Sequence, residues 1–168
     1  PALFSRQLNQ ALVIGLGTGV TAGELTLYPG LKQIDVAEIS PSVVEALPLF
    51  EKYTYSVHKD PRVNIHTGDA FRVMGRANKK WDIITSEPSN VWVTGVDLLF
   101  TREFYELAAE HLSDGGVFVQ WIQLYSTDLA MLGMMVNTVQ QEFEFVRGFL
   151  AGPGDLLLLA SKHQITND

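Results

Sequence analysis

The sequence contains no cysteine, and this absence excludes several kinds of chemistry at once. Without thiols the chain can form neither disulfides nor thiolate metal sites, and it cannot use a cysteine nucleophile. The four histidines are scattered along the chain and lack the spacing of a metal site, so we expect no bound metal.

Long apolar runs and an excess of basic residues are also missing. No run approaches the ~20 apolar residues of a membrane span, and the first residues lack the apolar core of a signal peptide. We therefore expect no membrane contact by this chain and a cytoplasmic location. The net charge of −7 argues against nucleic acid as a partner, because nucleic acid requires a basic patch. The same charge is compatible with a cationic substrate.

Short apolar strands alternate with helical segments along the 168 residues, which fit one domain. The expected strands are Gln10–Leu16, Gln33–Ile39, Arg62–Thr67, Trp81–Ser86, Val117–Leu124, Phe145–Ala151 and Asp155–Ser161. The expected helices are Thr18–Tyr28, one from Ser40-Pro41 through Val43, Val44, Leu47 and Phe50, then Ala70–Ala77, Thr101–Leu112 and Thr127–Phe143. This alternation predicts an α/β fold with a mostly parallel sheet covered by helices on both faces. The turn Gly152-Pro153-Gly154 predicts one antiparallel strand at the end.

The first strand runs into the glycine-rich turn Gly15-Leu16-Gly17-Thr18-Gly19. Such a turn needs glycine for positive φ angles and for the close approach of a ligand. The dinucleotide fingerprint G-x-G-x-x-G would require glycine where this chain has Val20. The turn therefore favours an adenosyl cofactor without a pyrophosphate, and it makes a dinucleotide oxidoreductase the least favoured alternative.

Two acidic residues follow later strands where a nucleoside would be bound. Glu38 ends the second strand, about 20 residues after the glycines. From this position a carboxylate can accept hydrogen bonds from the ribose hydroxyls of a nucleoside. We expect Ile39, the next residue, to contact the cofactor as well. Asp69 with Ala70 follows the third strand and is expected at the adenine, although Asp69 could equally cap the next helix.

Glu87 follows the fourth strand and is the candidate catalytic residue. A carboxylate at this edge can hold an ammonium or take a proton from an amine nucleophile. The alternative is a loop acid that only anchors the turn at Pro88. Asn90, Gln120 and Tyr125 are the candidate residues for binding the substrate.

These motifs resemble the spermidine synthase (aminopropyltransferase) family. Within it, they resemble the bacterial spermidine-synthase-like domains of longer, often membrane-fused chains. The resemblance is carried by ALVIGLGTGVTAGEL (11–25), IDVAEISPSVVEA (34–46), DPRVNIHTGDAF (60–71), WDIITSEPSN (81–90), LFTREFYELAAEHLSDGGVFVQW (99–121) and DLLLLAS (155–161). It implies the Rossmann-like fold of class I S-adenosylmethionine-dependent methyltransferases, with a seven-stranded sheet ordered 3-2-1-4-5-7-6. It also implies decarboxylated S-adenosylmethionine as donor and a small amine such as putrescine as acceptor.

The chain departs from the family pattern at several positions. Thr18 stands where the family has an Asp at the donor's aminopropyl end, Glu87 replaces the catalytic Asp, and the neutral Asn90 matches a second Asp. We expect residues 1–168 to form the catalytic domain alone, without the family's N-terminal β-strand domain, and a homodimer is possible. These departures leave two alternatives open: a methyltransferase using intact S-adenosylmethionine, and a non-catalytic module that binds an adenosyl cofactor.

Overall fold

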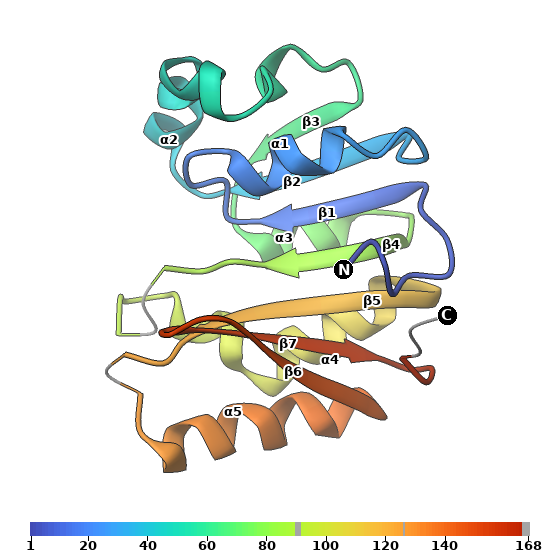
Figure 1. The fold of residues 1–168 in the computed structure, drawn as a ribbon, viewed down its shortest axis with the longest axis vertical. Helices are drawn as coiled ribbons and strands as arrows, with labels where there is room; N and C mark the ends of the chain where they lie inside the picture. The colour runs from blue at the N-terminus through green and yellow to red at the C-terminus, as the bar shows by residue number, and fades with distance from the viewer. Residues whose placement is uncertain (90–91, 126, 166–168) are drawn as a thin grey trace.

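The computed structural model describes residues 1–89, 92–125 and 127–165. Its sheet has seven strands in the order β3-β2-β1-β4-β5-β7-β6, which confirms the predicted order (Figure 1). The strands are β1 Gln10–Ile14, β2 Gln33–Glu38, β3 Val63–Thr67, β4 Trp81–Ser86, β5 Leu112–Gln123, β6 Phe145–Gly152 and β7 Asp155–Ser161. The helices are α1 Val20–Thr26, α2 Pro41–Ala46, α3 Ala70–Arg76, α4 Arg102–His111 and α5 Leu129–Glu142, with short 3₁₀ turns at Leu47–Tyr53, Val57–Lys59 and Asp97–Phe100.

The direction of the strands decides which residues meet at one edge of the sheet. Strands β1 to β5 are parallel to one another, so their carboxyl ends share one edge. Strand β7 is antiparallel to both β5 and β6, as the final turn predicts. Its first residue, Asp155, therefore pairs with Gln123 at the end of β5 and lies at that same edge.

Helices cover both faces of the sheet, and each face has its own apolar core. Helices α3, α4 and α5 pack on one face around Phe104, Phe118 and Val139. Helix α1 packs on the other face, where Ala22 and Leu25 meet β1, β2 and β4. Figure 1 shows α1 in front of the sheet and α3 and α4 behind it.

Two predicted helices have different boundaries in the structure. The first begins at Val20 rather than Thr18, because Gly19 has a left-handed backbone with φ of 87°. The second ends at Ala46, and Leu47–Tyr53 continues as a 3₁₀ helix. Pro48 has no N–H to donate along an α-helix, which explains the change. Within the described residues no helix is long and apolar enough to cross a membrane.

Strand β5 is longer than predicted. It begins at Leu112, and the predicted turn Asp114-Gly115-Gly116 lies inside it, at a register shift opposite Trp81 and Ile83. Helix α4 is capped by Thr101, whose hydroxyl accepts a hydrogen bond from the Phe104 N–H. Ser40 precedes α2 as expected, but its side chain makes no capping bond.

Candidate active site

The glycine turn joins β1 to α1 at the carboxyl edge of the sheet. Gly15, Gly17 and Gly19 all have positive φ angles, of 90°, 52° and 87°. A Cβ on Gly15 would lie 2.8 Å from the Glu87 carbonyl oxygen, whereas a Cβ on Gly17 would have no atom within 4 Å. Gly15 is therefore required for packing of the protein itself. Gly17 is exposed and faces open space, where a ligand can approach the backbone closely.

Glu38 is buried, with only 7% of its surface exposed. Its carboxylate accepts the Leu16 N–H over 2.9 Å and the Ser40 N–H over 2.8 Å. These two bonds join the glycine turn to the loop after β2, so that Glu38 fixes the shape of the turn. Each carboxylate oxygen can accept more than one hydrogen bond. Binding of ribose hydroxyls by Glu38 stays a prediction that this geometry allows.

The other predicted cofactor residues lie at the ends of β2 and β3. Ile39 is 72% exposed although it is strongly apolar, and Ala70 is buried at the start of α3. The Asp69 carboxylate accepts the Arg72 N–H over 3.0 Å, which confirms that Asp69 caps α3. The Asp69 side chain is also 44% exposed, so the cap leaves it accessible to a ligand at this edge. Contact of these residues with adenine stays a prediction.

Glu87 lies directly beyond β4, against the end of β1. Its N–H donates to the Ile14 carbonyl over 2.9 Å, which continues the pairing of the two strands. One carboxylate oxygen accepts the Thr21 hydroxyl over 2.7 Å, and the other accepts the Thr85 hydroxyl over 3.2 Å. Both bonds run to the body of the domain rather than to the turn at Pro88. The half-buried carboxylate is thus held in place by two neutral donors.

Two of the three predicted substrate-binding residues, Gln120 and Tyr125, lie in the described part of the chain. Gln120 is fully buried, and it lies next to Ser86 in the sheet. Its Nε2 donates to the Trp121 carbonyl over 3.2 Å, and its Oε1 has no partner among the described residues. Tyr125 is 53% exposed and its ring contacts Trp92 at 6.3 Å between centroids. Asn90 lies outside the described residues.

The site residues predicted from the sequence do not include Thr21, Thr85 or Asp155. Thr85 is two residues before Glu87, and side chains two apart on a strand share a face. The sequence therefore contained enough information to place Thr85 beside Glu87. Thr21 is in the first turn of α1, directly after the glycines. Across the described part of the chain, no group of three or more His, Asp or Glu side chains could hold a metal ion.

The protein-family model of the spermine/spermidine synthase domain matches residues 1–151 of this chain. The chain belongs to this family. A polyamine aminopropyltransferase of Nitrosomonas europaea is 28% identical over 151 residues, which cover 89% of this chain and 46% of the relative. One of Clostridium botulinum is 34% identical over 119 residues, covering 71% of this chain and 42% of the relative. The chain thus spans less than half the length of these curated members of the family.

Solved structures share the fold. A spermidine synthase in complex with the transition-state analogue AdoDATO has a TM-score of 0.89 at 22% identity, covering 99% of this chain and 59% of that one. Human methyltransferase-like protein 13 in complex with SAH has a TM-score of 0.75 at 21% identity, covering 97% and 76%. These similarities establish the Rossmann-like methyltransferase fold for this member of the family.

Proposed function

We propose that this domain transfers an aminopropyl group from decarboxylated S-adenosylmethionine to a small amine such as putrescine. One observation carries the proposal: the Glu87 carboxylate lies beside the glycine turn, held by two hydroxyls and by no cation among the described residues. Membership of the spermine/spermidine synthase family supports it.

The glycine turn and its neighbours would bind the donor. The open space above Gly17 suits the close passage of the adenosyl group, and Glu38 retains acceptor capacity for the ribose. The exposed side chain of Ile39 offers an apolar contact for the adenine ring, and Asp69 can accept its exocyclic amine. Leu16, Thr18, Gly19 and Ala70 complete the proposed binding edge.

Glu87 would act on the acceptor amine. An ammonium bound by the carboxylate transfers one proton to it, which frees the nitrogen lone pair. The lone pair forms a bond to the methylene carbon beside the donor's sulfonium, while the carbon–sulfur bond breaks and its electrons remain on sulfur. The products are a longer polyamine and methylthioadenosine, and the proton on Glu87 passes to solvent. The protein therefore supplies orientation and one base, with no covalent intermediate.

The test is to incubate the chain with decarboxylated S-adenosylmethionine and putrescine and to measure methylthioadenosine. We expect product that increases with time and depends on putrescine. The matched control is the Glu110→Gln variant, which removes one exposed carboxylate from α4 and should leave the rate unchanged. Methylthioadenosine no greater than in protein-free samples would contradict the proposal.

Methyl transfer from intact S-adenosylmethionine is the second candidate, and Thr18 is the observation that favours it. Thr18 is exposed and neutral, so the turn itself presents no charge that would reject the carboxylate of the intact cofactor. Glu87 opposes this alternative, because a second carboxylate nearby would be repelled. Calorimetry with both donors separates the two readings, and we expect tighter binding of the decarboxylated one. Binding of either compound without turnover would instead favour a non-catalytic module. The homodimer and the cytoplasmic location stay predictions.

A further inference from the structure

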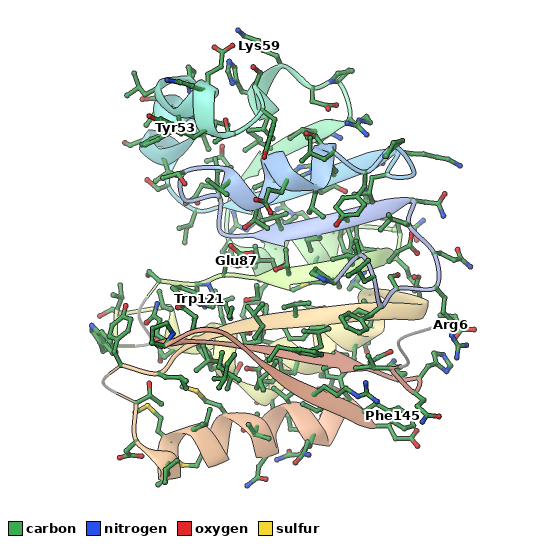
Figure 2. The ribbon with its side chains drawn as sticks, in the orientation of Figure 1. Arg6, Tyr53, Lys59, Glu87, Trp121 and Phe145 are labelled. Carbon is green, nitrogen blue, oxygen red and sulfur yellow. The ribbon has the colours of Figure 1, made fainter. Side chains whose placement is uncertain are left out.

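A pocket of about 350 Å³ opens beside Glu87 at the carboxyl edge of the sheet. Its other lining residues are Trp121, Ala151, Asp155 and Leu157, which come from β5, β6 and β7. Figure 2 shows Glu87 and Trp121 at the same end of the sheet. The volume is within the range of about 300–1,000 Å³ that is usual for small-molecule sites. The carboxylate of Glu87 thus has room for a small ligand next to it.

Asp155 is the second acidic residue of this pocket. One of its carboxylate oxygens accepts the Trp121 indole N–H over 3.0 Å, which fixes the side chain. The other oxygen is turned toward Gly152, where an added Cβ would lie 3.4 Å away. Because residue 152 is glycine, it has no side chain that could cover this second oxygen of Asp155.

The pocket carries negative charge without a balancing cation. Among the described residues, neither Glu87 nor Asp155 forms an ion pair with Lys, Arg or His. Their partners are the hydroxyls of Thr21 and Thr85 and the indole of Trp121, all of which are neutral. Two such carboxylates in one pocket attract a dication more strongly than a monocation of the same size. The Trp121 ring adds an apolar wall that can pack against methylene groups.

We infer that Asp155 determines the preference of this pocket for α,ω-diamines. The nitrogen that reacts lies at Glu87, and the distal ammonium is bound by the oxygen of Asp155 that faces away from Trp121. The inference rests on the proposed function, and it adds a residue that determines specificity: Asp155 at the start of β7 binds the second positive charge of the acceptor. Asp155 acts on binding only, because it does not contact the reacting carbon.

The test compares 1,4-diaminobutane with 1-butylamine, which has the same carbon chain and only one ammonium. Calorimetry with the protein saturated in methylthioadenosine gives the Kd of each amine. For the unmodified chain we expect the diamine to bind at least about tenfold more tightly. In the Asp155→Asn variant, which keeps an oxygen for the Trp121 indole, we expect that preference to disappear while the Kd of 1-butylamine stays unchanged.

Two further variants control for folding and for general charge. Asp155→Glu keeps the negative charge and should retain part of the preference for the diamine. Glu110→Gln changes the net charge by the same amount as Asp155→Asn but lies on α4, and it should retain the preference fully. Thermal unfolding of each variant verifies that the domain is folded.

The outcomes separate this inference from the proposed function. Equal affinity for the two amines in the unmodified chain, no binding of either, or a preference that persists in Asp155→Asn would overturn the role of Asp155. If methylthioadenosine still forms with both amines in those cases, the proposed aminopropyl transfer stands alone. If instead the preference depends on Asp155 but no methylthioadenosine forms, the binding role stands and the proposed reaction fails.

Discussion

The Thr21 hydroxyl donates to the Glu87 carboxylate over 2.7 Å, and this bond joins the first turn of α1 to the loop after β4. The same helix follows the glycine turn, so one short element connects the proposed cofactor site with the proposed base. Glu87 therefore has a fixed orientation before any ligand is bound.

Removal of this hydroxyl should impair catalysis more than binding. In Thr21→Val the Glu87 carboxylate loses a donor without a change in the size of the side chain at position 21. Because hydrogen bonds to charged groups contribute about 1.5–3 kcal/mol, we expect kcat to fall by about tenfold or more. Thr21→Ser keeps the hydroxyl and should remain close to the unmodified rate. Steady-state kinetics check this, and equal rates for Val and Ser at this position would contradict the role of Thr21.

Gly15 and Gly17 should respond differently to the same substitution. Gly15→Ala would carry the cost of a left-handed backbone and would also place a Cβ 2.8 Å from the Glu87 carbonyl oxygen, so we expect a total loss of about 2–5 kcal/mol in the free energy of unfolding. Gly17→Ala meets no atom within 4 Å and should cost only about 1–2 kcal/mol, the cost of a left-handed backbone. It should nevertheless weaken methylthioadenosine binding, because the methyl group occupies the open space.

Urea unfolding and calorimetry measure the two effects. Unchanged methylthioadenosine affinity in a folded Gly17→Ala protein would mean that the cofactor does not pass over this turn.

The role of Glu38 can be tested on the ligand as well as on the protein. If Glu38 accepts the ribose hydroxyls, 2′-deoxy- or 3′-deoxy-methylthioadenosine should bind the unmodified chain more weakly than methylthioadenosine does. In Glu38→Gln that difference should shrink, because the charged acceptor is missing. Stability should fall too, since the carboxylate accepts the N–H groups of Leu16 and Ser40. A difference between the ligands that is the same in both proteins would remove Glu38 from the ribose site.

Asp35 predicts how stability depends on pH. Burial by itself raises its pKa, but bonds from His66 at 2.9 Å, Lys79 at 2.5 Å and Trp81 at 2.8 Å outweigh burial and hold the pKa below its ordinary value. A lowered folded-state pKa gives a stabilisation that is present above the unfolded pKa of about 3.9 and is lost as the pH falls through the folded pKa.

Urea unfolding at a series of pH values from 6 downward tests this relationship. The free energy of unfolding should decrease below about pH 4, and the decrease should be smaller in Asp35→Asn. At pH 6 that variant should be less stable by about 1.5–3 kcal/mol, because the bonds to a charged acceptor are lost. The Glu110→Gln control should follow the unmodified protein. The same pH dependence in Asp35→Asn would contradict this account.

The sequence alone predicts the sheet and the glycine turn well, because both depend on local patterns. Glycines between an apolar strand and a helix predict the turn at Gly15–Gly19, and the alternation of strands and helices predicts the parallel sheet. The helix boundaries were less predictable. Helix α1 begins only at Val20, because Gly19 has a left-handed backbone, and α2 ends before Pro48, which begins a 3₁₀ helix with Leu47.

The proposed acceptor side of the site could not be predicted in the same way. The Thr21–Glu87 bond and the Trp121–Asp155 bond join residues far apart in the chain, and no local pattern reports such a pair. One indirect signal existed for Asp155. An antiparallel strand beside β5 must begin at the edge where β5 ends, so an acidic first residue in β7 had to lie near the site.

The rate of methylthioadenosine formation in Glu87→Gln is the most direct test of the central claim. The substitution keeps the shape of the side chain and removes only its charge and basicity. With decarboxylated S-adenosylmethionine and putrescine, we predict that kcat falls by about 10²–10⁴ while the affinity for methylthioadenosine stays unchanged. A Glu87→Gln protein that turns over as fast as the unmodified chain would contradict the claim that Glu87 is the base.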